Sequence, residues 1–227
     1  MGMPFRLHAG DPAPRQQTGT TCGSACLTVS RMLVDEAFAG WIREGIEGIG
    51  EDARDIDDAP RATEVTDSRT PIERFGAYEQ VVARRTNALV GAGGRWQPPW
   101  PRALGTPPWG AINELECGAA DPEADFDLQW CRLARRRRLE KAYAALRARV
   151  RERRPALLYI GNAWLPRHVV LVLPATGSGA DARTLDVYEP SVGRVVNLPR
   201  ESFVSRRLRL AGWDHPWAIV WDDSVTT

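Results

Sequence analysis

The chain has 227 residues, 43% of them hydrophobic, and a formal net charge of +1. This length suits one large domain, or a domain carrying a large insertion. The charge balance alone argues neither for nor against a nucleic-acid partner, and we expect none. No stretch approaches 18 consecutive apolar residues, so we expect no transmembrane helix and no membrane partner.

The N-terminal sequence MGMPFRLHAGDPAPRQQ lacks the apolar segment and the cleavage pattern of a signal peptide. We therefore expect a cytoplasmic protein whose four cysteines, at positions 22, 26, 117 and 131, are reduced thiols. A zinc site made of all four is disfavoured, because Cys117 and Cys131 do not form a second close pair.

The first half of the chain predicts helices joined by irregular segments. Residues 1–21 are rich in Pro and Gly and should be extended, and a helix should run from Cys22 to near Gly40, with apolar residues recurring on one face. The acidic stretch 44–73 predicts a surface loop or short helices. A proline opens a helical pattern over 71–90. The Gly-, Pro- and Trp-dense stretch 91–110 predicts an irregular loop.

An arginine-rich helix is expected over residues 132–154. Leu139, Tyr143, Leu146 and Val150 recur at helical intervals behind the RRRR run at 135–138. The outer face should be solvated and should meet the acidic 44–73 region. The alternative is a docking surface for an acidic partner at 135–154.

The last third predicts strands separated by turn residues. Because helices come first and strands follow, the fold class should be α+β. The predicted strands are 156–161, 168–173, 184–189, 193–198 and 217–222.

Cys22 lies where the Gly- and Thr-rich approach RQQTGTT turns into a helix. A helix N-terminus stabilises the thiolate, which is the reactive form of cysteine. Such a nucleophile also needs a base and a group that orients the base. Cys26 lies one turn further along on the apolar face, where a core role is the expectation.

His168 opens the apolar strand HVVLVL and is the candidate base. A symmetric hairpin of 168–173 with 184–189 would place Glu189 directly opposite it, within hydrogen-bonding reach. Asp186 would then point to the other face. A one-residue slip would reverse this choice, so Asp186 remains the alternative to Glu189.

Attack by a thiolate on a carbonyl builds an oxyanion, which needs aimed donors. The Cys22 backbone N–H can supply one donor, and the side-chain amide of Gln16, six residues earlier, can supply the other. Gln17 is the adjacent alternative.

These residues carry a family resemblance. The Gln-x5-Cys-Gly-Ser-Ala-Cys-Leu pattern, the late HVVLVL and the segment VYEPSVGRVVNLPRESF resemble the papain-like cysteine peptidases. Within them, the bacterial double-glycine leader peptidases, the C39-like family, are most similar. The resemblance implies a papain-like fold, with a central Cys22 helix packed on a C-terminal antiparallel sheet. It implies Cys22 as nucleophile, His168 as base, Glu189 as orienting group and Gln16 in the oxyanion hole.

The chain also departs from that family. Glu189 stands where Asp or Asn is usual, no exporter is attached, and the large Cys-to-His separation makes residues 41–150 a helical or irregular insertion within a single domain, 1–227. We expect hydrolysis of a peptide or protein substrate with no metal and no cofactor. The alternatives are a transferase, deamidase or transglutaminase-like enzyme on the same fold, or an inactive binding module.

Two features of the insertion admit further roles. The paired glycines of GAGG, 91–94, could be a self-cleavage site, although a flexible loop is the simpler explanation. Trp96, Trp100 and Trp109 could line a substrate groove, although packing is the commoner role of such residues.

Overall fold

The computed structural model describes residues 4–45, 67–174 and 184–224. Most of the acidic stretch 44–73 lies outside the described residues, and so does its expected contact with the arginine-rich helix. Within the described ranges no helix is long and apolar enough to cross a membrane. The α-helices are α1 (Cys22–Val34), α2 (Glu36–Glu44), α3 (Pro71–Thr86), α4 (Pro108–Glu114), α5 (Arg136–Arg149) and α6 (Arg200–Val204).

Six antiparallel strands form one sheet in the order β1-β6-β2-β3-β4-β5. The α+β class is therefore confirmed, and all five predicted strands are present. The sequence analysis missed β1, which pairs with β6 at one edge. The strands are β1 (Phe126–Trp130), β2 (Ala156–Gly161), β3 (Pro166–Leu173), β4 (Thr184–Glu189), β5 (Arg194–Pro199) and β6 (His215–Asp222).

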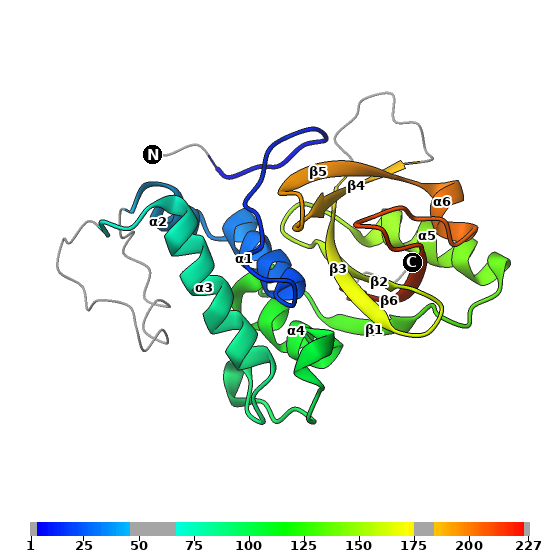
Figure 1. The fold of residues 1–227 in the computed structure, drawn as a ribbon, viewed down its shortest axis with the longest axis horizontal. Coiled ribbons are helices and arrows are strands. Elements are labelled where there is room, and N and C mark those ends of the chain that lie inside the picture. Colours follow the sequence, from blue (N-terminus) through cyan, green and yellow to red (C-terminus); the bar gives the residue numbers. More distant parts are fainter. Residues whose placement is uncertain (1–3, 46–66, 175–183, 225–227) are drawn as a thin grey trace.

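Both faces of the sheet are covered. Leu157, Tyr159 and Val169 point into a core shared with α1–α4, while Leu158 and Val170 point into a core shared with α5 and α6. Figure 1 shows α1–α4 gathered on one side of the sheet and α5 and α6 on the other. Burial on both faces explains why the central strands read as continuous apolar runs rather than alternating ones.

The expected helix from Cys22 to Gly40 is two helices. Asp35 ends α1 in an extended conformation, and its side chain accepts a hydrogen bond of 2.9 Å from the Phe38 backbone N–H. Asp competes well for such N-cap positions, so a single aspartate divides an otherwise helical pattern.

The helix expected at 71–90 is confirmed as α3. Thr70, the N-cap residue, and Glu73, in the first turn, form a reciprocal capping box, and Pro71 is the first residue of the helix. Together they explain why α3 begins sharply at Pro71. The stretch 91–110 is mostly irregular, as expected, with 3-10 turns at Ala92–Gly94 and Arg102–Leu104. It ends in α4, which the sequence analysis missed.

Two of the three tryptophans in this stretch pack on each other. The rings of Trp100 and Trp109 meet edge to face, with centroids 5.1 Å apart, and the Trp109 indole donates to the Pro98 carbonyl at 3.0 Å. Trp96 is exposed. The GAGG segment forms an ordered turn in which Gly93 has a positive φ and abuts the Cys117 sulfur. Self-cleavage at this segment was the less favoured interpretation of the sequence, and the geometry of the turn does not test it.

The arginine-rich helix is confirmed as α5, with Leu139, Tyr143 and Leu146 buried against the sheet. On its outer face Arg136 pairs with Glu201 at 2.8 Å and with Glu140 at 3.4 Å. The acidic partner for residues 135–154 stays a prediction.

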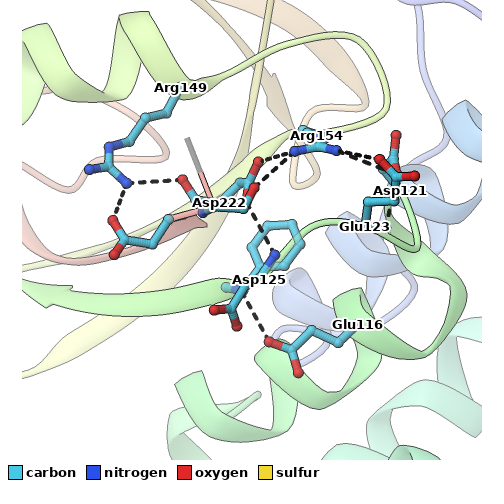
Figure 2. Close-up of polar contacts among 10 residues, drawn as sticks. Glu116, Asp121, Glu123, Asp125, Arg149, Arg154 and Asp222 are labelled. Carbon is cyan, nitrogen blue, oxygen red and sulfur yellow. Dashed lines mark hydrogen bonds and ion pairs between the residues drawn. The ribbon is translucent and has the colours of Figure 1, made fainter. Parts of the chain in front are cut away.

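The buried carboxylate of Asp222 links the start of β1 to the rest of the sheet (Figure 2). Asp222, at the end of β6, accepts hydrogen bonds from Arg154 at 2.8 Å and from the Asp125 backbone N–H at 3.2 Å. Glu116 accepts from the first N–H of β1, at Phe126, at 3.0 Å. Polar side chains therefore fix where β1 begins.

Replacing Asp222 by Ala should lower the free energy of unfolding by about 3 kcal/mol, because Arg154 loses a buried partner. Burial opposes ionisation, but hydrogen bonds from Ser224 and Arg154 hold the pKa of Asp222 below its ordinary value. Its contribution is therefore present above about pH 4 and is lost as pH falls through the depressed pKa. Urea unfolding of wild type and Asp222→Ala at pH 7 and pH 3 measures this. An equal difference at both pH values would contradict it.

Candidate active site

Cys22 is the first residue of α1, and this helix has no side-chain cap at its N-terminus. The preceding residue, Thr21, makes no side-chain hydrogen bond to the helix. The first N–H groups of a helix have no partner within it and carry partial positive charge. Cys22 and His168 are 3% and 6% exposed, so both residues are buried.

The 105–106 segment covers the first turn of α1. A Cβ on Gly23 would lie 2.6 Å from the Thr106 Cβ, so glycine is needed for this close approach. The Ser24 and Thr106 hydroxyls are 3.2 Å apart and hydrogen-bonded. The Pro- and Trp-rich stretch thus reaches the helix start next to Cys22.

His168 lies beside an irregularity in the sheet. Ile160 pairs with His168 and Gly161 with Pro166, which leaves Arg167 unpaired directly before the histidine. Such bulges re-aim neighbouring side chains. The His168 Nε2 is 2.6 Å from Glu189 Oε1, and both side chains are buried.

The environment of His168 favours its charged form. Burial acts to lower the pKa of His168, but side-chain hydrogen bonds with Cys22 and Glu189, together with the charges of those two groups, raise it to about 9. The histidine is thus held between the sulfur on one side and the carboxylate on the other. Three residues distant in sequence, 22, 168 and 189, are brought together.

The hairpin register differs from the expected one by two residues. Val172 pairs with Val187, not with Leu185. Because the shift is even, the apolar side chains keep the predicted face. Continuing this register places Glu189 opposite Val170, diagonal to His168. Diagonal neighbours are roughly 7–8 Å apart, which suits a long side chain.

Asp186, the alternative orienting group, is far from His168 along the sheet. It pairs with Leu173, five residues along β3, or about 16 Å. The Asn197 side-chain amide donates to Asp186 at 3.1 Å.

The segment that carries Gln16 is held against the Glu189 turn. The Gln16 backbone N–H donates to the Pro190 carbonyl at 2.9 Å, and Arg15 Nε donates to the Ser191 carbonyl at 2.7 Å. The Ser191 N–H in turn donates to Glu189 Oε1 at 2.9 Å. Gln16 is therefore anchored beside the residue that contacts His168.

The side chain of Gln16 is engaged within its own loop. One N–H of its amide donates to the Thr18 carbonyl at 2.6 Å, which leaves the second N–H for another acceptor. Its Oε1 is buried and has no hydrogen-bond partner among the described residues. The side chain of Gln17, the adjacent alternative, packs against Gly76 of α3 and donates to the Arg15 carbonyl at 3.3 Å.

A pocket of about 820 Å³ adjoins this loop. Its lining includes Gln16, Gln17 and Ser191, together with the apolar side chains of Met32 and Phe75. A volume of this order accommodates a small organic molecule or a few side chains.

Cys26 is fully buried, and its thiol donates to the Val169 carbonyl at 3.5 Å. Burial, followed by the negative charges of Cys22, Glu189 and Glu79, raises the pKa of Cys26 well above its usual range. Cys26 is thus a neutral core thiol, as expected. The described ranges contain no cluster of three or more His, Cys, Asp or Glu residues arranged for a metal.

The sequence analysis overlooked Glu79 of α3, which is completely buried. Its carboxylate accepts a shared hydrogen bond from the Gln17 backbone N–H, at 3.2 and 3.1 Å. In the sequence it is one acidic residue among several polar ones in the helical stretch 71–90, so no local signal marks it.

No protein-family model matches the chain, and no curated protein matches it. Among solved structures, the chain is similar to the Pseudomonas avirulence protein AvrPphB, at 11% sequence identity and a TM-score of 0.46. The alignment covers 95% of this chain and 97% of that chain. A function therefore has to be argued from the geometry of this chain's own residues.

Proposed function

We propose that the chain is a papain-like cysteine peptidase that uses Cys22, His168 and Glu189. The observation that carries the proposal is at His168, which is hydrogen-bonded to Glu189 at 2.6 Å and whose pKa is raised by its interaction with Cys22 as well as with Glu189. A nucleophile, a base and a group that orients the base are the minimum set for acyl transfer at a thiol.

In the proposed reaction the Cys22 sulfur, as thiolate, attacks the carbonyl carbon of a peptide bond. A C–S bond forms and the carbonyl electron pair moves to oxygen. When the tetrahedral intermediate collapses, the C–N bond breaks and His168 gives its proton to the departing amine. Water, deprotonated by His168, then attacks the thioester, which releases the carboxylic acid and restores the thiol.

Two donors are available for the oxyanion. One is the Cys22 backbone N–H at the uncapped start of α1, and the other is the second amide N–H of Gln16. Each must point to the position that the oxyanion takes. The hydrogen bond from the Gln16 backbone to Pro190 holds the second donor on the side of the Glu189 turn.

The raised pKa of His168, about 9, gives the reaction its pH range. Below that value the imidazole is protonated and can serve the leaving amine, and above it this acid is lost. The dependence of kcat/KM on pH should therefore be bell-shaped, with its alkaline limb near pH 9, and both limbs belong to the coupled Cys–His pair.

Two probes test the proposal. With p-nitrophenyl acetate the enzyme should release p-nitrophenol and carry an acetyl group on Cys22 that mass spectrometry locates. With β-casein it should produce new peptide ends. Transfer of the acyl group to added methylamine instead of water would identify a transferase. Casein that is deamidated but not cleaved would identify a deamidase. An unmodified Cys22 and intact casein across pH 5–9 would refute the hydrolase.

A further inference from the structure

We propose that Glu79 is a positioning residue for the oxyanion site at Cys22, a role that rests on the proposed function above. Glu79 belongs to α3, within the stretch 41–150 that lies between the proposed nucleophile and base. It is completely buried, and no Lys, Arg or His of the described residues forms a salt bridge with it. A buried carboxylate without a cation is costly and calls for a specific reason.

Glu79 holds the beginning of the loop that joins the two oxyanion donors. Its two oxygens share the N–H of Gln17, which follows Gln16. The side chain of Thr21, which precedes Cys22, also acts to lower the pKa of the Glu79 carboxyl. One rigid helix thus fixes the segment on which Gln16 and the Cys22 N–H depend.

The loop that Glu79 anchors also leaves the start of α1 without a side-chain cap. Threonine at the residue before a helix commonly caps it with its hydroxyl. Here the Thr21 hydroxyl donates to the Thr18 carbonyl at 3.1 Å and accepts from the Thr18 backbone N–H at 3.2 Å, and it makes no capping bond. The helix N–H groups therefore remain available to an anion.

The role of Glu79 is geometric. A negative charge disfavours a neighbouring thiolate, so Glu79 cannot assist by promoting ionisation of the sulfur. Burial raises the pKa of Glu79, against the lowering effect of its hydrogen bonds with Thr21 and Gln17, so the carboxylate remains sensitive to loss of either donor. Its replacement should affect only steps in which an oxyanion forms.

Two reactions of Cys22 separate this role from a general structural one. Acylation by p-nitrophenyl acetate passes through an oxyanion, whereas alkylation by iodoacetamide does not. Glu79→Gln, with the same shape, and Glu79→Ala should lower the acylation rate roughly 10- to 100-fold, the order expected for misplaced groups. Alkylation of Cys22 should stay within about twofold of wild type, because displacement at an alkyl carbon needs no oxyanion donor.

Glu114→Ala is the matched control. Glu114 is a buried carboxylate of α4 paired with Arg85 of α3, and it does not contact the 17–21 loop. Per folded molecule, judged by thermal unfolding, this variant should acylate and alkylate as wild type does. Wild-type acylation by both Glu79 variants, or a parallel loss of both reactions, would overturn the role of Glu79. A wild-type protein that alkylates but never acylates would instead refute the proposed function.

Discussion

Replacing His168 by Ala should lower kcat/KM for p-nitrophenyl acetate and for casein by at least about 10⁴-fold. The imidazole interacts with the Cys22 thiol and is the base of the proposed pair. Loss of one member of a nucleophile–base pair costs about as much as loss of both. Cys22→Ala and the double variant should therefore show the same residual rate as His168→Ala.

His215→Ala provides the matched control for that experiment. His215 is hydrogen-bonded to Asp214 at 2.6 Å and so also forms a His–carboxylate pair, but it lies outside the proposed site. This variant should retain wild-type turnover. If turnover survived in His168→Ala but fell in His215→Ala, the base would be His215 and the assignment to His168 would be wrong.

Shortening Glu189 should be more harmful than neutralising it. Because Glu189 is diagonal to His168, Glu189→Asp withdraws the carboxylate by one methylene and should lower kcat/KM about 100-fold. Glu189→Gln keeps the reach and an acceptor oxygen, so the loss should be only about tenfold. The missing charge should also move the alkaline limb below pH 9, since the Glu189 charge helps to raise the pKa of His168.

Asp186→Asn is the control for the orienting carboxylate. Asp186 is buried like Glu189 and lies on the same strand, but it accepts a hydrogen bond from the Asn197 side chain. Turnover should not change in this variant. Equal turnover in Glu189→Asp and wild type, or a large loss in Asp186→Asn, would show that the diagonal contact does not orient the histidine.

The sequence predicted the strands well because their apolar runs are short and end at turn residues. It missed β1 because FDLQW is only five residues long and its start is fixed by Asp222 and Glu116, which are distant in sequence. It merged α1 and α2 because the capping role of Asp35 is visible only once its side chain is placed. Local sequence patterns reveal the periodicity of helices and strands, but they do not reveal polar contacts between residues distant in sequence.

The sequence predicted those residues of the candidate site that leave a local signal, and it missed those that do not. A cysteine at a helix start and a histidine opening an apolar strand are local signals, and the structure brings them together. The hairpin register was wrong by two residues, because Leu173 pairs with Asp186 rather than with Thr184. Glu189 remained the partner only because the error was even and its side chain is long. Glu79 had no local signal at all.

Selective alkylation of Cys22 tests the central claim most directly, and exposed Cys117 serves as the reference thiol in the same molecule. At pH 7 iodoacetamide should modify Cys22 at least about tenfold faster than Cys117, because the His168 imidazolium stabilises a thiolate. In His168→Ala the advantage should vanish. A Cys22 that reacts no faster than Cys117, or that keeps its advantage without His168, would contradict a catalytic pair at this site.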